Sequence, residues 1–128
     1  MRSVSFLKPK KIKSVFWNRF AVSSISYQKV NQQMIQRSHG KNQFRTVFVD
    51  FDDSPRRGER AVITRGSSPR SFRKCLRRSI ELSRTEGNTY LFINAWNEWG
   101  EGNYLEPDER YGFAYLNQVK KVLKRRGI

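Results

Sequence analysis

Two short apolar segments, each followed by a polar stretch and then a helical pattern, constrain the fold of this chain most. Residues 44–51 read FRTVFVDF and residues 89–94 read TYLFIN, and both are rich in the β-branched and aromatic residues that favour strands. Residues 44–51 are mostly apolar, which is the pattern of a buried parallel strand. The sequence therefore predicts alternating strands and helices with a parallel sheet.

Three helical patterns accompany these strands. The first covers residues 26–37, where Tyr27, Val30 and Met34 fall on one face. The second is expected to be capped by Ser67 or Ser68, and to end at Gly87. Its expected inner face consists of Phe72, Cys75, Leu76, Ser79, Ile80 and Ser83. The third is expected to start near Tyr111. An unbroken polar loop is expected over residues 52–68.

The order of these elements predicts an α/β fold with chemistry after the carboxyl end of each strand. Right-handed crossovers and polar residues at the strand exits match the active-site face of a (β/α) barrel. A complete barrel needs about 250 residues, and this chain of 128 residues supplies two parallel strands with three helices. We therefore expect the C-terminal portion of a (β/α)8 TIM-like barrel over residues 25–128, preceded by a basic, poorly ordered leader over residues 1–24.

Charge is the second large feature. The chain has 26 Lys and Arg against 11 Asp and Glu, a formal net charge of +15, and residues 1–49 contain no acidic side chain. Such a field attracts polyanions, which makes an anionic membrane surface a candidate partner of the basic N-terminal region. A solvated basic surface explains the same charge. Nucleic-acid binding rests on electrostatics alone, because no zinc-ligand spacing or RRM motif accompanies the charge.

The expected compartment is the cytoplasm, with peripheral attachment at the inner face of the membrane left open. The single cysteine, Cys75, excludes an internal disulfide and is most simply a core residue. His39 falls in an expected turn and is more simply exposed than catalytic. The N-terminus lacks the apolar stretch of a secretory signal. The sequence gives no indication of oligomeric state.

The strongest functional signal follows the second strand, where residues 92–102 read FINAWNEWGEG. Trp96 and Trp99 offer aromatic faces for stacking on sugar rings, and Asn94 and Asn97 offer amide hydrogen bonds. Two carboxylates close together are what acid/base chemistry on a glycosidic bond requires. The motif therefore indicates a sugar-handling site. The alternative is a solvated loop whose carboxylates only offset nearby arginines.

These segments resemble the WbsX-like glycosyltransferases, bacterial proteins of lipopolysaccharide O-antigen and other surface-polysaccharide biosynthesis. The resemblance rests on residues 46–58 and 93–115, including Asn-Glu-Trp-Gly-Glu-Gly at 97–102 and Leu-Glu-Pro-Asp at 105–108. It covers residues 25–123 and implies kinship with the endo-α-mannosidase glycoside hydrolases, which are (β/α)8 barrels. By that resemblance Glu98 and Glu101 are the catalytic acid pair. The resemblance does not indicate which of them is the acid/base. Glu106 and Tyr111 are expected to be structural, with Asp108 as a helix cap.

The loop after the first strand is the other candidate site. The family usually shows Trp-Asp-Asn before Ser/Thr-Pro-Arg, so Phe51 and Asp53 depart from its pattern. Asp52 is expected to bind a sugar hydroxyl, and Arg56 or Arg57 an anionic group. Asp50 and Asp52 also form an Asp-x-Asp pair that suits Mg²⁺ or Mn²⁺, but no further ligand cluster is visible. No metal and no cofactor is therefore expected.

The sequence thus predicts a carbohydrate-active protein of glycosyltransferase type, acting on an oligosaccharide or a sugar donor, and inactive by itself if these 128 residues are the whole product. Glycoside hydrolase-like chemistry, a non-catalytic carbohydrate-binding remnant, and a basic module for nucleic acid or anionic membranes are the alternatives. The sugar, the linkage and the stereochemical course are not determined by the sequence.

Overall fold

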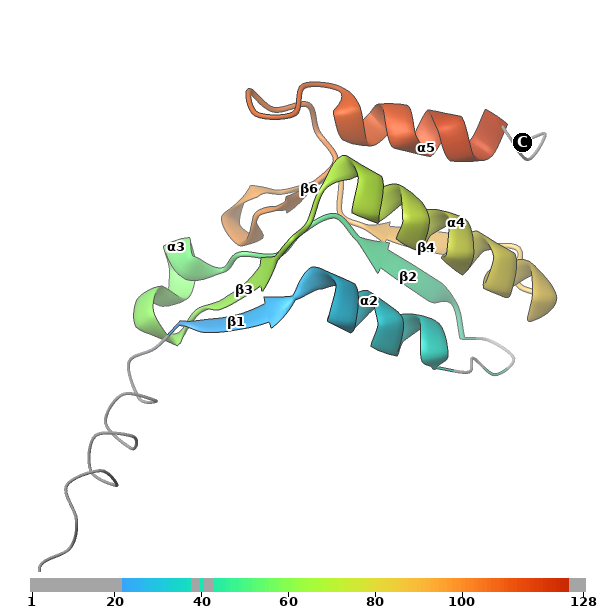
Figure 1. Ribbon diagram of the computed structural model, residues 1–128, viewed down its shortest axis with the longest axis horizontal. Helices are drawn as coiled ribbons and strands as arrows, with labels where there is room; N and C mark the ends of the chain where they lie inside the picture. Colours follow the sequence, from blue (N-terminus) through green and yellow to red (C-terminus); the bar gives the residue numbers. More distant parts are fainter. Residues whose placement is uncertain (1–21, 38–39, 41–42, 125–128) are drawn as a thin grey trace, which may run out of the picture.

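The computed structural model describes residues 22–37, 40 and 43–124 of the chain, an α/β arrangement in which helices cover short parallel strand pairs (Figure 1). In chain order the first elements are β1 (Ser23–Ser26), α2 (Tyr27–Gln36), β2 (Arg45–Phe48), α3 (Ser54–Arg57), the 3-10 turn η1 (Gly58–Arg60) and β3 (Val62–Arg65). The remaining ones are α4 (Pro69–Thr85), β4 (Leu91–Asn94), β5 (Asn97–Glu98), the 3-10 turn η2 (Trp99–Glu101), β6 (Asn103–Tyr104) and α5 (Ala114–Lys124).

The two strands expected from the sequence, β2 and β4, are parallel neighbours. Val47 lies opposite Ile93, and Phe48 lies opposite Asn94. One face of this pair is buried: Val47 is fully inaccessible, and Ile93 packs against the same core. Both strands therefore deliver their following loops to one edge of the sheet, as the parallel arrangement predicted.

Helix α4 begins as its sequence predicts. The Ser68 hydroxyl accepts a hydrogen bond from the backbone N–H of Ser71, and Pro69 occupies the first helical position, where its missing N–H costs nothing. Gly87, just past the helix, has φ +73°, a conformation that favours glycine. The predicted inner face is confirmed, with Phe72 and Leu76 almost completely buried.

The core lies between the β2–β4 pair and the helices α4 and α5, which run side by side (Figure 1). Phe72 of α4 meets Tyr115 of α5 edge to face, with ring centroids 5.6 Å apart. Cys75 belongs to this core, as expected. Its buried members are Val47, Val49, Phe72, Cys75, Leu76, Leu105, Tyr115 and Val122.

A buried arginine joins the C-terminal ends of α2 and α4 to the start of β2. The Arg45 guanidinium forms an ion pair with Glu86 at 2.5 Å, and only 4% of its side chain is exposed. The same group donates to the backbone carbonyls of Met34, Ile35 and Arg37 at the C-terminal end of α2. These are carbonyls that a helix end otherwise leaves without a partner, so one side chain ties α2, α4 and β2 together.

Two expectations from the sequence need correction. The unbroken polar loop over residues 52–68 is wrong, because it contains α3, η1 and β3, and β3 pairs in parallel with β1. Residues 23–26 read SSIS and give no strand pattern, whereas residues 62–65 read VITR, a short β-branched run that favours a strand. The pairing of these two segments is a tertiary contact. The last helix starts at Ala114 and not near Tyr111. The remaining helix prediction holds, since α2 begins after Ser26, whose hydroxyl accepts from the Lys29 N–H.

The architecture is α/β, and the strands of the described residues form two-stranded sheets that do not close into a barrel. Strand β1 begins at Ser23, inside the range expected to be a leader, while residues 1–21 and His39 lie outside the described residues. None of the described helices is long and apolar enough to cross a bilayer.

Candidate carbohydrate site at the ends of β2 and β4

The loops that leave β2 and β4 meet at one place, although the chain separates them widely. The backbone N–H of Asp52 donates to the carbonyl of Glu101 at 2.7 Å. The Arg56 guanidinium forms an ion pair with the Glu101 carboxylate, with Nη1 and Oε1 2.6 Å apart. Three of the residues expected to form the site, Asp52, Arg56 and Glu101, are therefore in direct contact.

A glycine permits this close approach. Gly102 has φ +57°, and a Cβ built on it would lie 3.3 Å from the Asp52 Cβ and 3.4 Å from the Asp52 backbone nitrogen. A Cβ there would require the loop that follows β2 to shift by a few tenths of an ångström, and the positive φ would add strain. Gly102 of the Asn-Glu-Trp-Gly-Glu-Gly motif is thus required by backbone packing between the two loops.

The motif itself folds into a small hairpin. Strands β5 and β6 are antiparallel, with Glu98 opposite Asn103 and Asn97 opposite Tyr104, and η2 forms the turn between them. The buried Asn103 anchors this hairpin, because its side-chain oxygen accepts the backbone N–H of Val49, just past β2, at 3.1 Å. Its amide nitrogen has no hydrogen-bond partner within the described part of the chain. This role of Asn103 was not expected from the sequence, because asparagines are common in turns and one more gave no signal of a structural role.

The two glutamates have different surroundings. Glu101 ends η2, is partly buried and is held by Arg56. Glu98 lies in β5, is exposed, and its side chain contacts no partner by hydrogen bond or ion pair in the described ranges. One carboxylate is therefore fixed by a cation, and the other is free to meet a ligand. The structure holds both near the edge of the β2–β4 pair, which is where catalytic groups of parallel α/β folds lie.

Trp99 is held on one face and open on the other. Its ring stacks on Tyr104 with centroids 3.7 Å apart and planes 19° apart. The indole Nε1–H donates to Glu106 Oε2 at 2.7 Å. Half of the Trp99 side chain is still exposed. Because Tyr104 covers one face, that exposure leaves the other face for a ligand.

Tyr104 and Glu106 were missed as contacts of the site. Glu106 was expected only in the lead-in to the last helix, yet it accepts the Trp99 hydrogen bond. Asp108 does cap a turn, since its carboxylate accepts the backbone N–H of Tyr111, but that turn precedes α5. Asp108 also accepts from the Tyr104 hydroxyl at 3.1 Å. Burial is the main reason that the pKa of Tyr104 is raised, and this hydrogen bond to Asp108 raises it further.

The remaining predicted residues of the motif lie exposed beside the hairpin. Asn94 ends β4, Asn97 lies in β5, and 52% of Trp96 is exposed. The Trp96 carbonyl accepts the N–H groups of Leu105 and Glu106, which fixes the backbone there. These side chains are thus available to a ligand, while the two hydrogen bonds to the Trp96 carbonyl hold the backbone in place.

The acidic residues after β2 have mainly structural partners. Asp50 accepts hydrogen bonds from the hydroxyls of Ser67, at 2.5 Å, and Thr64, at 2.6 Å. Asp53 is buried, accepts the Val62 N–H at 2.6 Å and pairs with Arg57. Asp50 therefore fastens the loop after β2 to β3 and to the start of α4, and Asp53 fastens it to β3. Within the described ranges, no three His, Cys, Asp or Glu side chains are grouped as metal ligands.

Comparison with known proteins identifies the class. The family described as glycosyltransferase WbsX matches residues 2–119, nearly the whole chain, and the chain belongs to that family. The family match starts at residue 2, whereas the motifs in the sequence indicated a resemblance that starts at residue 25.

The chain is also similar to two proteins of Xanthomonas campestris pv. campestris, each described as uncharacterized protein WxcX, from strain B100 and from strain ATCC 33913. Each is 40% identical over 82 residues, which is 62% of this chain and 12% of the relative. The matched stretch is thus a small part of those longer proteins. No solved structure matches the chain.

Proposed function

We propose that this chain forms part of a carbohydrate-active site of glycosyltransferase type, used in building lipopolysaccharide O-antigen or another surface polysaccharide. Glu98 and Glu101 are the acidic pair that acts at the glycosidic bond. Trp96 and Trp99 stack on sugar rings. Asn94, Asn97, Asp52 and Arg56 bind hydroxyl or anionic groups of the oligosaccharide or sugar donor.

The observation that carries this proposal is the contact between the two loops. Membership of the WbsX family makes a sugar substrate the expected class. The ion pair of Arg56 with Glu101, and the backbone hydrogen bond from Asp52 to Glu101, join two stretches of sequence that were both assigned to sugar binding. A loop with a purely structural role would have no need to leave two indoles about half exposed beside this contact.

The different surroundings of the two glutamates suggest a division of roles. A carboxylate held by a guanidinium is fixed in orientation, and an exposed carboxylate without such a partner is free to reach a ligand. We assign the proton-transferring role to Glu98, and to Glu101 the role of holding a hydroxyl in place. Either a transferase or a hydrolase-like reaction can use such a pair.

For the larger architecture, we propose that β2 and β4 are neighbouring strands of a (β/α) barrel and that α4 and α5 are its outer helices. Their parallel pairing, with helices packed on one face only, suits this arrangement. The opposite face of the pair carries Phe92, which is 55% exposed. In a barrel that face would point to the interior.

A non-catalytic carbohydrate-binding role is the second candidate. The Glu101 carboxylate is already occupied by Arg56, and Trp96 and Trp99 lie on an open surface instead of in an enclosed pocket. Open aromatic surfaces bind glycans without turning them over. The same open geometry leads us to expect binding without turnover from these 128 residues alone.

The test is glycan binding by the 128-residue protein, measured by saturation-transfer NMR against bacterial surface oligosaccharides. We expect Trp99→Ala to abolish binding and Phe113→Ala, which removes another exposed aromatic ring elsewhere, to leave it intact. Turnover is then measured in a longer family member with Glu98→Gln and Glu101→Gln at the aligned positions. Loss of turnover with binding retained supports the acidic pair, and unchanged turnover selects the binding role. Equal binding by the tryptophan and phenylalanine variants would exclude both.

A further inference from the structure

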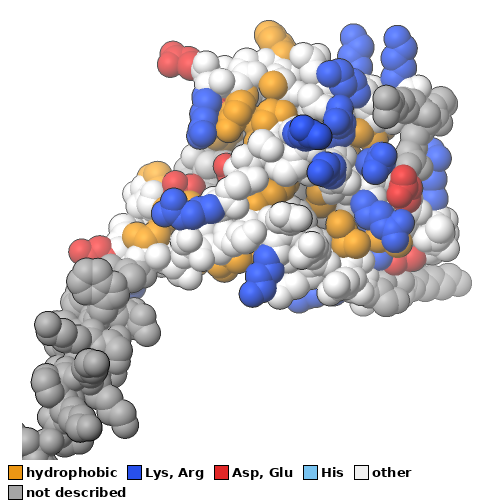
Figure 2. All heavy atoms as spheres, viewed as in Figure 1, with side chains coloured by type: hydrophobic (Ala, Val, Ile, Leu, Met, Phe, Trp, Pro, Cys, Tyr) orange, Lys and Arg blue, Asp and Glu red, His pale blue; other side chains and the backbone are white. Residues whose placement is uncertain are grey.

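A groove between α4 and α5 gathers positive charge away from the carbohydrate site. It has a volume of about 940 Å³ and is lined by six cationic side chains: Arg73, Lys74, Arg77 and Arg84 of α4, with Lys121 and Lys124 of α5. Lysines and arginines gather over these two helices in Figure 2. The β5–β6 hairpin lies at the opposite end of the molecule from the C-terminal ends of α4 and α5 (Figure 1).

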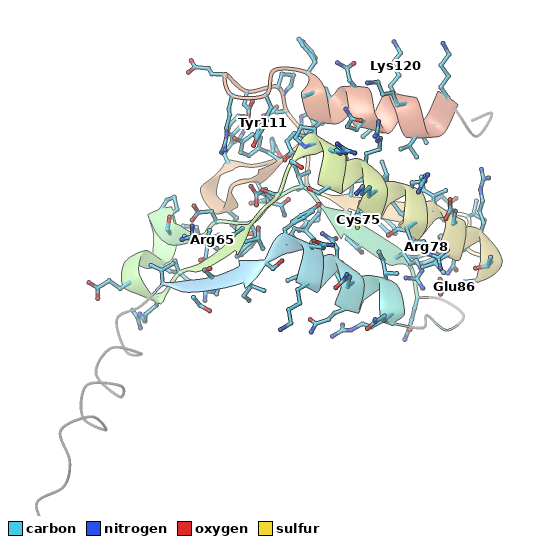
Figure 3. All side chains as sticks on the ribbon, viewed as in Figure 1. Arg65, Cys75, Arg78, Glu86, Tyr111 and Lys120 are labelled. Atoms are coloured by element: carbon cyan, nitrogen blue, oxygen red, sulfur yellow. The ribbon has the colours of Figure 1, made fainter. Side chains whose placement is uncertain are left out.

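Cationic side chains outnumber acidic ones in this groove. Among the described residues that line it, one is acidic, Glu81, which lies 3.6 Å from Arg78. Figure 3 shows Arg78 on α4. Cations in the last turn of a helix are stabilised by the helix dipole, which accounts for Arg84, Lys121 and Lys124. Arg73, Lys74 and Arg77 lie in the first half of α4 and gain nothing from it. Arg73 and Arg77 are four residues apart on α4, a spacing at which like charges repel, and an anion in the groove would relieve that repulsion.

The residues that line the groove limit the kinds of anion that it can bind. The cations on α4 extend from Arg73 to Arg84, about 16 Å along the helix axis at the usual rise per residue, so they span several neighbouring phosphates. None of the described residues that line the groove is an aromatic on which a base could stack. Val122 is the one apolar residue among them. The site is therefore suited to repeated phosphate charges and not to bases or sugar rings.

We propose that the α4–α5 groove binds the phosphate headgroups of anionic lipids and attaches the protein to a membrane surface. The charge complementarity needs no apolar insertion, because long basic side chains reach headgroups while their stems stay on the helix. The attachment is independent of the proposed sugar chemistry. It also places the membrane contact on α4 and α5, in addition to any contribution of the basic N-terminal region.

The test is co-sedimentation of the full chain with phosphatidylcholine vesicles, with and without phosphatidylglycerol. A groove variant combines Arg77→Gln, Arg84→Gln and Lys121→Gln. A matched control removes the same charge outside the groove with Lys29→Gln, Arg60→Gln and Lys120→Gln, all exposed positions; Lys120 lies on α5 in Figure 3. Circular dichroism establishes that both variants fold.

We expect the native protein to bind the vesicles that contain phosphatidylglycerol and not those of phosphatidylcholine alone. The affinity should fall roughly 100-fold in the groove variant and no more than about threefold in the control variant. Equal losses in the two variants would overturn the proposal, because net charge and not the groove would then govern binding. Tighter, groove-dependent binding of a single-stranded oligonucleotide would assign the groove to nucleic acid instead. Groove-dependent binding of inorganic pyrophosphate without vesicle binding would assign it to a soluble ligand, and would equally overturn the proposal.

Discussion

Arg56 and Glu101 form an ion pair, with Nη1 and Oε1 2.6 Å apart, across 45 residues of sequence. The two residues belong to different loops, one after β2 and one after β4, so this contact defines how the halves of the candidate site fit together. The Arg56 side chain is 62% exposed and that of Glu101 is 29% exposed. Water therefore screens the pair, and its value is expected to lie in positioning more than in stability.

The first prediction separates positioning from stability at this ion pair. Arg56→Gln removes the cation, and we expect the free energy of unfolding to fall by less than about 1 kcal/mol, as for other exposed pairs. Glycan affinity should fall by about tenfold or more, since Glu101 loses the group that orients it and a ligand loses a charged contact. Urea denaturation and saturation-transfer NMR measure the two effects.

Arg60→Gln is the matched control, because Arg60 is also exposed and lies in the adjacent turn η1. It should change neither quantity. A glycan affinity that is the same in Arg56→Gln and in the native protein would show that the ion pair plays no part in the site.

The second prediction concerns the orientation of Trp99. Glu106→Ala removes the acceptor of the indole N–H, whereas Glu106→Gln keeps an amide oxygen that can accept it. We expect the Trp99 indole N–H resonance to shift upfield in the alanine variant and to return toward its native position in the glutamine variant. Glycan affinity should follow the same order, because an indole held only by its stacking on Tyr104 is less restrained and binds with a larger entropic cost.

Glu109→Ala serves as the control for charge, since Glu109 is exposed and close in sequence. If alanine and glutamine at position 106 gave the same indole resonance and the same affinity, the hydrogen bond would not position the ring.

Local patterns were enough to predict the elements whose hydrophobic faces are strong. Val47 and Phe92 belong to β-rich runs, and Phe72 and Leu76 repeat at helical spacing, so β2, β4 and α4 could be read from the chain. Ser68, Pro69 and Gly87 marked the ends of α4 because capping chemistry is local. These predictions needed no knowledge of distant contacts.

The elements that were missed depend on partners far along the chain. Residues 23–26 have one apolar side chain and form β1 by pairing with residues 62–65. Residues 62–65 do carry a β-branched run, Val-Ile-Thr, but its shortness and polar surroundings led to the prediction of a loop. In the site, Asp52, Arg56 and Glu101 were predicted separately, and the structure adds that they touch. Tyr104 and Asn103 gave no signal, because stacking and burial arise only once the hairpin folds back onto β2.

A third prediction concerns the buried pair of Arg45 and Glu86. Glu86→Gln leaves a buried guanidinium without its counter-charge, and removal of one partner from such a pair is strongly destabilising. We expect a loss of about 3 kcal/mol in the free energy of unfolding, moderated by the three carbonyls that Arg45 retains. Glu81→Gln on the same helix, where the ion pair is longer and more exposed, should cost no more than about 0.5 kcal/mol. Equal losses from the two substitutions, measured by urea denaturation, would contradict this assignment.

The last prediction is a loss of stability at alkaline pH that originates in Cys75. Burial raises the pKa of the Cys75 thiol to about 11, above its ordinary value of 9.0. The unfolded chain therefore releases this proton at lower pH than the folded protein, so the free energy of unfolding falls as pH rises from about 9 to about 11. The fall should amount to roughly 2 kcal/mol. Cys75→Ala should remove this component while leaving the later fall caused by tyrosines.

Tyr27 and Tyr115 provide that later fall, because burial raises the pKa of each above the ordinary value of 10.0. Their contribution therefore begins about one pH unit above that of the thiol, and the difference between the native protein and Cys75→Ala isolates the cysteine. The measurement is urea denaturation at a series of pH values, paired with the rate of thiol labelling. A thiol that reacts in the folded protein as fast as in urea, or a variant with the same pH profile as the native chain, would show that Cys75 is not shielded by the core between α4 and β2.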